Sequence, residues 1–163
     1  MRASGLFNLC VSALAWAGTA ASFSPRPQER VPNCPPRPAT PQQQRAILGQ
    51  FSQAFYYERN ATKALLDYVS KDYIQHNPGA LSGRQKTLDV LGPVLSSDAI
   101  EFTVLRLAFD NNLAFVHYRM DIVGGGEPSA IVDVYRFNGT CIMEHWDVIQ
   151  ERDSNSLNPL ALF

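Results

Sequence analysis

The sequence has no excess of charge of either sign, and this absence excludes several classes of partner. Its 14 basic and 15 acidic residues give a net charge of −1, so the balance calls for neither nucleic acid nor an anionic membrane surface. Beyond the N-terminus, no apolar run is long enough to span a bilayer. Internal repeats are also missing. What remains is a chain of 163 residues, 45 % of them apolar, which suits one domain with a hydrophobic core.

Patterns of the common metal, phosphate and nucleophile sites are missing too. The three histidines, His76, His117 and His145, are far apart and lack metal-site spacing. The glycines at 124–126 lack the spacing of a phosphate-binding loop, and the chain has no Gly-x-Ser-x-Gly motif. We therefore expect neither a metal nor another cofactor.

The first 21 residues have the pattern of a secretory signal peptide. Arg2 supplies a positive charge, Leu6–Ala17 is a short apolar run, and small residues follow at Gly18–Ala21. The run is too short for a membrane span, and an N-terminal anchor is the alternative interpretation. We therefore predict a secreted, extracellular protein that has no membrane contact after cleavage of residues 1–21.

Cleavage would remove Cys10 and leave two cysteines, Cys34 and Cys141. In an oxidising compartment such a pair is a candidate disulfide, and the alternative is two unpaired thiols. The triplets that begin at Asn60 and Asn138 match the N-glycosylation pattern. If both are modified, both asparagines face solvent.

The N-terminal half predicts an irregular arm followed by helices. Residues 22–41 are rich in proline and arginine, which favours an extended arm that Cys34 would tie down. Apolar residues from Ile47 to Phe55 have helical spacing and predict an amphipathic helix from Gln42 to near Arg59. Asn60 is typical of the N-cap of a second, shorter helix.

The second helix is expected to run into the stretch KDYIQHNPG at Lys71–Gly79, where Pro78 forces a turn. Ser82 is a candidate N-cap for a third helix, in which Leu88, Leu91 and Leu95 face inward.

After residue 97 the apolar period drops to two, which predicts strands. The four expected strands are Ile100–Phe109, Leu113–Ile122, Ser129–Phe137 and Ile142–Gln150. Helices followed by an antiparallel meander indicate an α+β fold in which the helices cover one face of a curved sheet. Residues 152–163 form an irregular tail whose apolar end could pack back on the domain.

Three segments carry the most specific motifs of the chain. They are YIQHNPG at Tyr73–Gly79, IVDVYRFNG at Ile131–Gly139 and IMEHWDVIQ at Ile142–Gln150. Together they resemble the SnoaL-like polyketide cyclase family of the nuclear-transport-factor-2-like superfamily, over residues 42–151. The resemblance implies a cone-shaped α+β fold with a pocket between a bent antiparallel sheet and its N-terminal helices.

The resemblance also implies a chemistry. In characterised cyclases of this family an acidic residue is the acid/base of an intramolecular aldol condensation, and Asp133 in the DVYR motif matches it. His76 and His145 match histidines of a subgroup assigned to aldol condensation. One departure is the hairpin tip, where relatives commonly carry Asp-Gly and this chain has Asn138 before Gly139. Many relatives with this fold are not enzymes, so the fold alone does not define the function.

Asp133 is the central candidate because an aldol closure needs a base beside a carbonyl and a donor for the developing oxyanion. It lies in the apolar run AIVDVYRF and shares a strand face with Tyr135. Burial of a lone carboxylate is costly without a partner. An exposed strand acid or a cross-strand salt bridge is the alternative.

His145 and Asp147 flank Trp146, so the first two share one face of their strand and Trp146 takes the other. A solvent-facing polar stripe opposite a buried tryptophan is the alternative. A two-residue loop pairs Asp133 with Glu144, whereas a three-residue loop pairs it with His145. The turn residues favour the first register. That register sets the negative charges of Asp133 and Glu144 opposite each other, which favours the second, and a bulge would reconcile the two arguments. We favour a face shared by Asp133 and His145.

The stretch KDYIQHNPG is interpreted as one wall of the cavity, with Tyr73 and His76 on the same side of a helix end. A helix end that caps itself with these polar groups is the alternative. His117 fits a satisfied core or surface histidine better than a catalytic one. The full set of candidate substrate-binding residues is Tyr73, Gln75, Asn77, His117, Tyr135, Trp146 and Asp147.

Two hypotheses follow. In the first, the protein is a cofactor-free cyclase, isomerase or lyase that acts on a small carbonyl compound, with Asp133, His76 and His145 as catalytic residues. In the second, it is a non-catalytic module of the same fold that binds an apolar small molecule or assembles through its sheet. Relatives of this fold often pair through the sheet, so the resemblance also implies a homodimer.

Overall fold

A computed structural model describes residues 31–163. The predicted signal peptide at 1–21, Cys10 and the first part of the arm at 22–30 lie outside the described residues. Within the described part, no helix is long and apolar enough to cross a membrane.

The helices form where capping and apolar spacing favour them. Helix α1, Pro41–Ser52, begins with a capping box. The Thr40 hydroxyl accepts from the Gln43 backbone amide, and the Gln43 side-chain oxygen accepts from the Thr40 backbone amide. Helix α2, Ala61–Tyr68, is capped by the Asn60 side chain, as predicted. Helix α3, Arg84–Ser96, follows Gly83, and no side chain caps it.

Helix α1 does not continue regularly to Arg59. Residues Gln53–Tyr57 form a π-helical turn, η1, which is one residue wider than an α-helical turn. The wider turn brings Tyr56 to the inside together with Phe51 and Phe55, and all three side chains are buried. Regular helical spacing would not place Tyr56 on the apolar stripe of this helix.

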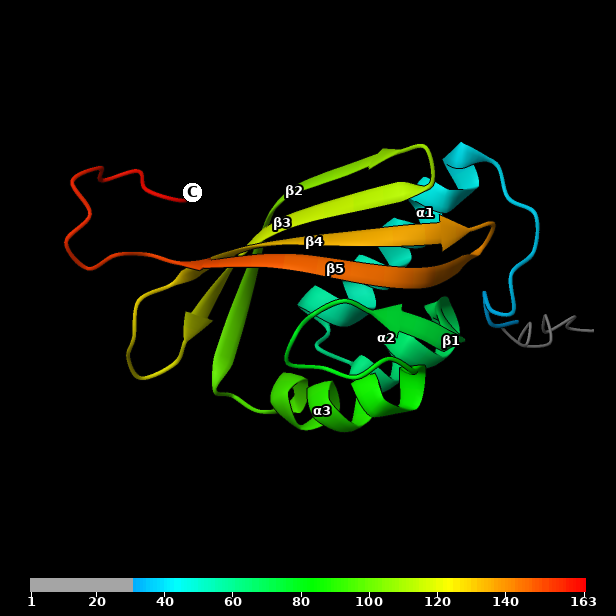
Figure 1. Cartoon of the computed structure of the whole chain (residues 1–163), viewed down its shortest axis with the longest axis horizontal. Coiled ribbons are helices and arrows are strands. Elements are labelled where there is room, and N and C mark those ends of the chain that lie inside the picture. Colours follow the sequence, from blue (N-terminus) through cyan, green and yellow to red (C-terminus); the bar gives the residue numbers. More distant parts are fainter. Residues whose placement is uncertain (1–30) are drawn as a thin grey trace, which may run out of the picture. The chain divides into compact units, whose positions relative to one another are not determined.

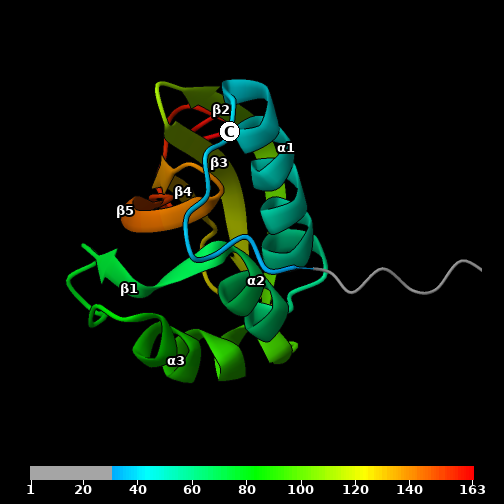
Figure 2. The ribbon, with the colours of Figure 1, turned by 90° about the vertical axis from the view of Figure 1, so that its right-hand side faces the viewer.

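Five strands form one mixed sheet in the order β1-β5-β4-β3-β2. The strands are β1 Val69–Gln75, β2 Ile100–Asp110, β3 Leu113–Ile122, β4 Ser129–Asn138 and β5 Cys141–Glu151. Strands β2 to β5 form the predicted antiparallel meander, and β1 pairs in parallel with β5 (Figure 1). The three α-helices pack against this sheet, so the α+β class is confirmed (Figure 2).

The stretch KDYIQHNPG was wrongly predicted as a helix end. The chain leaves the helix at Val69 with extended backbone angles, and residues 69–75 form strand β1. Gln75 lies opposite His145, and the His76 amide donates to the His145 carbonyl at 3.0 Å. Because strand side chains alternate, Tyr73, Gln75 and Asn77 share one side and His76 takes the other. Ser82 was also wrongly predicted as a cap; its hydroxyl instead accepts from the Gln75 amide.

The β4–β5 hairpin follows neither predicted register. Its loop is Gly139-Thr140, between the paired residues Asn138 and Cys141, and a bulge follows between Arg136 and Phe137. The bulge puts Asp133 opposite Asp147 and Tyr135 opposite His145. The predicted bulge and the face shared by Asp133 and His145 are therefore both present, although the pairing partner differs.

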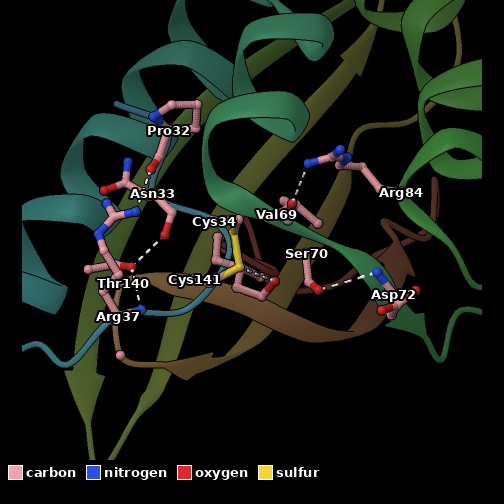
Figure 3. The surroundings of a disulfide bond; sticks show 12 residues. Pro32, Asn33, Cys34, Arg37, Val69, Ser70, Asp72, Arg84, Thr140 and Cys141 are labelled. Atoms are coloured by element: carbon pink, nitrogen blue, oxygen red, sulfur yellow. Dashed lines mark hydrogen bonds between the residues drawn. A yellow bond between two sulfur atoms is a disulfide. The ribbon is translucent and has the colours of Figure 1, made fainter. Parts of the chain in front are cut away.

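The arm crosses the tip of this hairpin. Cys34 and Cys141 form a disulfide, with Cα atoms 5.1 Å apart. The Thr140 hydroxyl donates to the Asn33 carbonyl and accepts from the Arg37 amide at 3.1 Å (Figure 3). The Arg37 carbonyl in turn accepts from the Thr140 amide at 2.9 Å. The described part of the arm is thus irregular but fixed to the start of β5.

The C-terminal tail beyond β5 has no helix or strand, as predicted for residues 152–163. Its last side chain packs back on the sheet, since the Arg119 guanidinium lies over the Phe163 ring at 4.8 Å from its centroid. Leu157 and Leu160 remain exposed.

Candidate functional site

A cavity of about 250 Å³ lies between the helices and the sheet. Apolar side chains from α1, α2, α3, β2 and β3 form most of its wall, including Phe51, Leu65, Leu95, Phe102 and Met120. Its polar groups come from the neighbouring strands β1, β4 and β5. They are Tyr73 and Gln75 of β1, Asn77 just after it, Asp133 and Tyr135 of β4, and His145 and Asp147 of β5, together with Tyr118 of β3 and Thr87 of α3.

Asp133 is the most deeply buried of the charged groups, with 3 % of its surface exposed. Its Oδ2 accepts hydrogen bonds from the hydroxyls of Tyr56 and Tyr135, the latter at 3.0 Å. Its Oδ1 lies 3.1 Å from Nε2 of His145. One oxygen is therefore held by tyrosines, and the other faces the histidine.

Burial, followed by the charge of Asp133, raises the pKa values of Tyr56, Tyr118 and Tyr135 well above their usual range. Burial also raises the pKa of Tyr73. These hydroxyls therefore hold their protons more firmly than a free tyrosine, and those of Tyr56 and Tyr135 donate to the carboxylate.

His145 is 7 % exposed, and its orientation is set by Gln75. The backbone amide of Asn77 can only donate, and it lies 3.0 Å from the Gln75 side-chain atom Oε1, so that atom is the amide oxygen. The same oxygen lies 2.9 Å from Nδ1 of His145, which must therefore donate to it. In the neutral ring the proton is then on Nδ1, and Nε2 presents a lone pair near Asp133.

Asp147 completes the polar end of the cavity. It lies directly across the ladder from Asp133, and its Oδ2 accepts from the Asn77 side-chain amide at 2.5 Å. Single ligand atoms of Asp133, His145 and Asp147 all lie within 4.8 Å of one another. These are the described residues that a metal ion could use.

Three residues expected in the site lie elsewhere. His76 stacks on Trp146 with ring centroids 4.5 Å apart, and its Nε2 contacts Glu144 at 3.2 Å. This pair lies on the face of the sheet that points away from Asp133, because Trp146 alternates with His145 on β5. His117 contacts Arg106 through Nδ1 at 2.8 Å. None of the three lines the cavity, so the structure contradicts their placement in the site.

Sequence reasoning missed Tyr56 and Tyr118. Adjacent residues of a strand point to opposite faces of the sheet, so an outward His117 already predicts that Tyr118 points inward. Tyr56 is different, because it reaches Asp133 only through the π-helical turn η1. The apolar spacing of the sequence shows no sign of that turn.

A helical layer on a strongly bent mixed sheet, with a cavity whose polar groups converge at one end, defines the nuclear-transport-factor-2-like class. Residues 48–145 match the model of the SnoaL-like domain, and the chain belongs to this family. The expected fold is confirmed. No curated protein sequence matches the chain.

Solved structures agree on the fold. A nuclear-transport-factor-2-like protein of unknown function from Mesorhizobium loti is 17 % identical, with a TM-score of 0.60 over 70 % of this chain and 97 % of that one. A candidate ketosteroid isomerase from Kribbella flavida is 17 % identical, with a TM-score of 0.58 over 75 % and 88 %. A candidate polyketide cyclase from Acidithiobacillus ferrooxidans is 19 % identical, with a TM-score of 0.53 over 66 % and 88 %.

Proposed function

We propose that the protein is a cofactor-free SnoaL-like cyclase or lyase that carries out aldol-type acid–base chemistry on a small carbonyl compound. The observation that carries the proposal is the buried pair of Asp133 Oδ1 and His145 Nε2, 3.1 Å apart in a largely apolar cavity. Similarity to structures described as a candidate isomerase and a candidate cyclase supports the same class of chemistry.

In the proposed reaction, Asp133 Oδ1 removes a proton from the carbon next to a carbonyl, and the resulting enolate attacks a second carbonyl of the same molecule. The proton on Asp133 passes to the lone pair of His145 Nε2, and the imidazolium then gives this proton to the alkoxide that forms, which restores both groups. Two features support this division of roles. The tyrosines hold the other carboxylate oxygen, and Gln75 holds Nδ1 of the ring.

The experiment that tests the proposal is proton exchange in heavy water, followed by NMR on a panel of small diketones. It reads proton removal directly and does not require the natural substrate. We expect the wild type to exchange the protons beside a carbonyl and Asp133→Asn to lose about 10²- to 10⁴-fold in rate while keeping its fold. His117→Gln is the matched control, since this histidine lies outside the cavity. An Asp133→Asn rate equal to that of the wild type overturns the proposal.

The apolar lining supports a second candidate, a binding module for apolar small molecules. Its signature would be a ligand that raises the melting temperature of the wild type while neither exchange nor turnover occurs across the panel.

Secretion, glycosylation at Asn60 and Asn138, and a homodimer complete the proposal. The Cys34–Cys141 disulfide supports an oxidising compartment, and both asparagines are exposed. The exposed side chains of Phe115 and Val148 support pairing through the sheet. Glycosidase digestion with mass spectrometry tests the first two, and analytical ultracentrifugation tests the dimer.

A further inference from the structure

The cavity contains two carboxylates and, within the described part of the chain, no lysine or arginine among its lining residues. Asp133 is buried, and Asp147 faces it across the β4–β5 ladder. Two carboxylates close together in an apolar environment are costly unless a positive charge compensates them. The arrangement therefore favours a cation at the polar end of the cavity.

The second observation concerns His145. Its side chain is 7 % exposed, and Nε2 has no hydrogen-bond partner among residues 31–163. Asp133 Oδ1 lies 3.1 Å away, but not in the direction in which Nε2 would donate or accept. The ring nitrogen thus points beside the carboxylate oxygen rather than at it. This is the orientation that two ligands of one ion adopt, because each points at the ion and neither points at the other.

The distances fit such an ion. With metal–ligand bonds of about 2.1 Å, two atoms 3.1 Å apart subtend an angle of roughly 95° at the metal. The third ligand atom, from Asp147, completes a set that spans no more than 4.8 Å. Opposite ligands of an octahedral ion with the same bonds are about 4.2 Å apart, so a small side-chain rotation would close the site.

Each ligand is also supported from outside by a neutral partner. Tyr56 and Tyr135 hold Asp133, Asn77 holds Asp147, and Gln75 accepts the Nδ1 proton of His145. A histidine that binds a metal through one nitrogen commonly donates the other N–H to an oxygen in this way.

We propose that Asp133, His145 and Asp147 form a binding site for one six-coordinate divalent transition-metal ion. One imidazole nitrogen and two carboxylates suit such an ion, and its charge neutralises both carboxylates. The inference does not rest on the proposed proton transfer. An ion at this site would occupy the atoms that the proton transfer uses, so bound metal is expected to stop proton exchange.

The test is titration of the chelator-treated full chain with zinc chloride, read by isothermal calorimetry and by metal analysis after dialysis. We expect one ion per chain in the wild type. Asp147→Asn should weaken binding at least about 10-fold, and Gln75→Leu should weaken it about 10- to 100-fold through His145. Substitution with cobalt should produce a visible absorption band that shifts in Asp147→Asn.

Two controls separate this site from surface binding. Asp121→Asn changes an acid that is paired with Arg119 outside the cavity, and His76→Gln changes a histidine next to an acid on the other face of the sheet. Both variants should bind zinc as the wild type does. The proposal is overturned if the wild type binds no ion, or if Asp147→Asn and His145→Gln, shown by circular dichroism to be folded, bind it unchanged. Neither result affects the exchange test of Asp133.

Discussion

At the scale of single residues, Gln75 decides which nitrogen of His145 faces the cavity. Its amide oxygen accepts from both the Asn77 backbone and His145 Nδ1, so a single side chain connects the end of β1 with the middle of β5. Because the oxygen is fixed by a backbone donor, the amide cannot turn over without losing two hydrogen bonds. Gln75 is therefore a positioning residue, whose effect reaches the reaction through His145.

Replacing this amide should change the histidine more than the fold. In Gln75→Leu we expect a mixture of His145 tautomers and a loss of about 2- to 10-fold in proton exchange, because only part of the population then keeps its proton on Nδ1. Nitrogen NMR of the ring reports the tautomer directly. Gln75→Glu restores an acceptor for Nδ1 and should recover the wild-type tautomer. A single unchanged tautomer in Gln75→Leu would contradict this role.

The residues of the site differ in how well the sequence predicts them. Asp133 and His145 follow from the resemblance to the family, and strand alternation adds Asp147 on the face of His145. Gln75 and Asn77 were expected at the cavity on a helix end, whereas Gln75 is the last residue of strand β1 and Asn77 follows it. His76 was misplaced for the same reason, since residues three apart, such as Tyr73 and His76, share a side of a helix but point to opposite sides of a strand.

At the scale of elements, the β4–β5 hairpin carries an ion-paired outer face behind the site. Glu144 accepts two hydrogen bonds from Arg136 of β4, and its other oxygen contacts His76 beyond β1. Arg136 first, and then His76, lowers the pKa of the Glu144 carboxyl below 4.5. A carboxyl with a lowered folded-state pKa stabilises the fold above its unfolded pKa, and this contribution is lost as the pH falls through the folded value.

Glu144→Gln should therefore lower stability at pH 7 by about 1 kcal/mol or less, since the pair is partly exposed. The difference from the wild type should shrink as the pH falls below 4.5, where the wild-type carboxyl also takes up its proton. Urea unfolding from pH 7 to pH 3 measures the difference. Glu101→Gln, an exposed acid of β2, is the control. A difference that stays constant with pH would contradict the assignment.

The tip of the same hairpin requires glycine where the arm crosses it. Gly139 has φ of +51°, and a Cβ there would lie 1.9 Å from the Arg37 carbonyl oxygen. We expect Gly139→Ala to lower the unfolding free energy by about 1–3 kcal/mol, since it combines backbone strain with a clash. Chemical denaturation measures the loss. Gly124→Ala is the control, because its φ is +93° but no atom lies within 4 Å of the added Cβ. If Gly139→Ala and Gly124→Ala lose the same unfolding free energy, the clash with the Arg37 carbonyl does not contribute to the effect.

Elements were predictable to the extent that they depend on local pattern. The strand Leu113–Ile122 has the expected bounds, β2 and β4 are longer than expected by one residue at one end, and β5 is longer by one residue at each end. Strand β1 was missed because, among residues 31–163, its strand partner is β5 alone, about 70 residues later in the chain. A parallel pairing over such a distance leaves no trace in a short window of sequence.

At the scale of the whole molecule, the Cys34–Cys141 disulfide closes a loop between residues 107 positions apart. Such a loop restricts the unfolded chain strongly, so Cys34→Ala with Cys141→Ala should lower the unfolding free energy by about 2–5 kcal/mol. Guanidinium unfolding of this double variant measures the effect. The reduced wild type is the control and should unfold near the same midpoint. A midpoint equal to that of the oxidised wild type would show that the bridge contributes little.

The overall α+β architecture was predictable because all three α-helices precede the meander of strands β2 to β5 and because three motifs resemble one family. The cavity could not be predicted in the same way. Its lining residues depend on how α1, β1 and β5 pack against one another. This packing is set by contacts over the whole chain rather than by any one motif.

The π-helical turn has one more consequence, which concerns how such a protein changes over generations. A turn of this kind is what a one-residue insertion leaves in an α-helix. Loss of the codon for Gln53, an exposed residue, would return the segment to a regular helix and rotate its two halves by about 100° relative to each other. The Tyr56 hydroxyl would then leave Asp133 while the sheet stayed intact. A single in-frame deletion could thus separate lineages in which this carboxylate is restrained from lineages in which it is free.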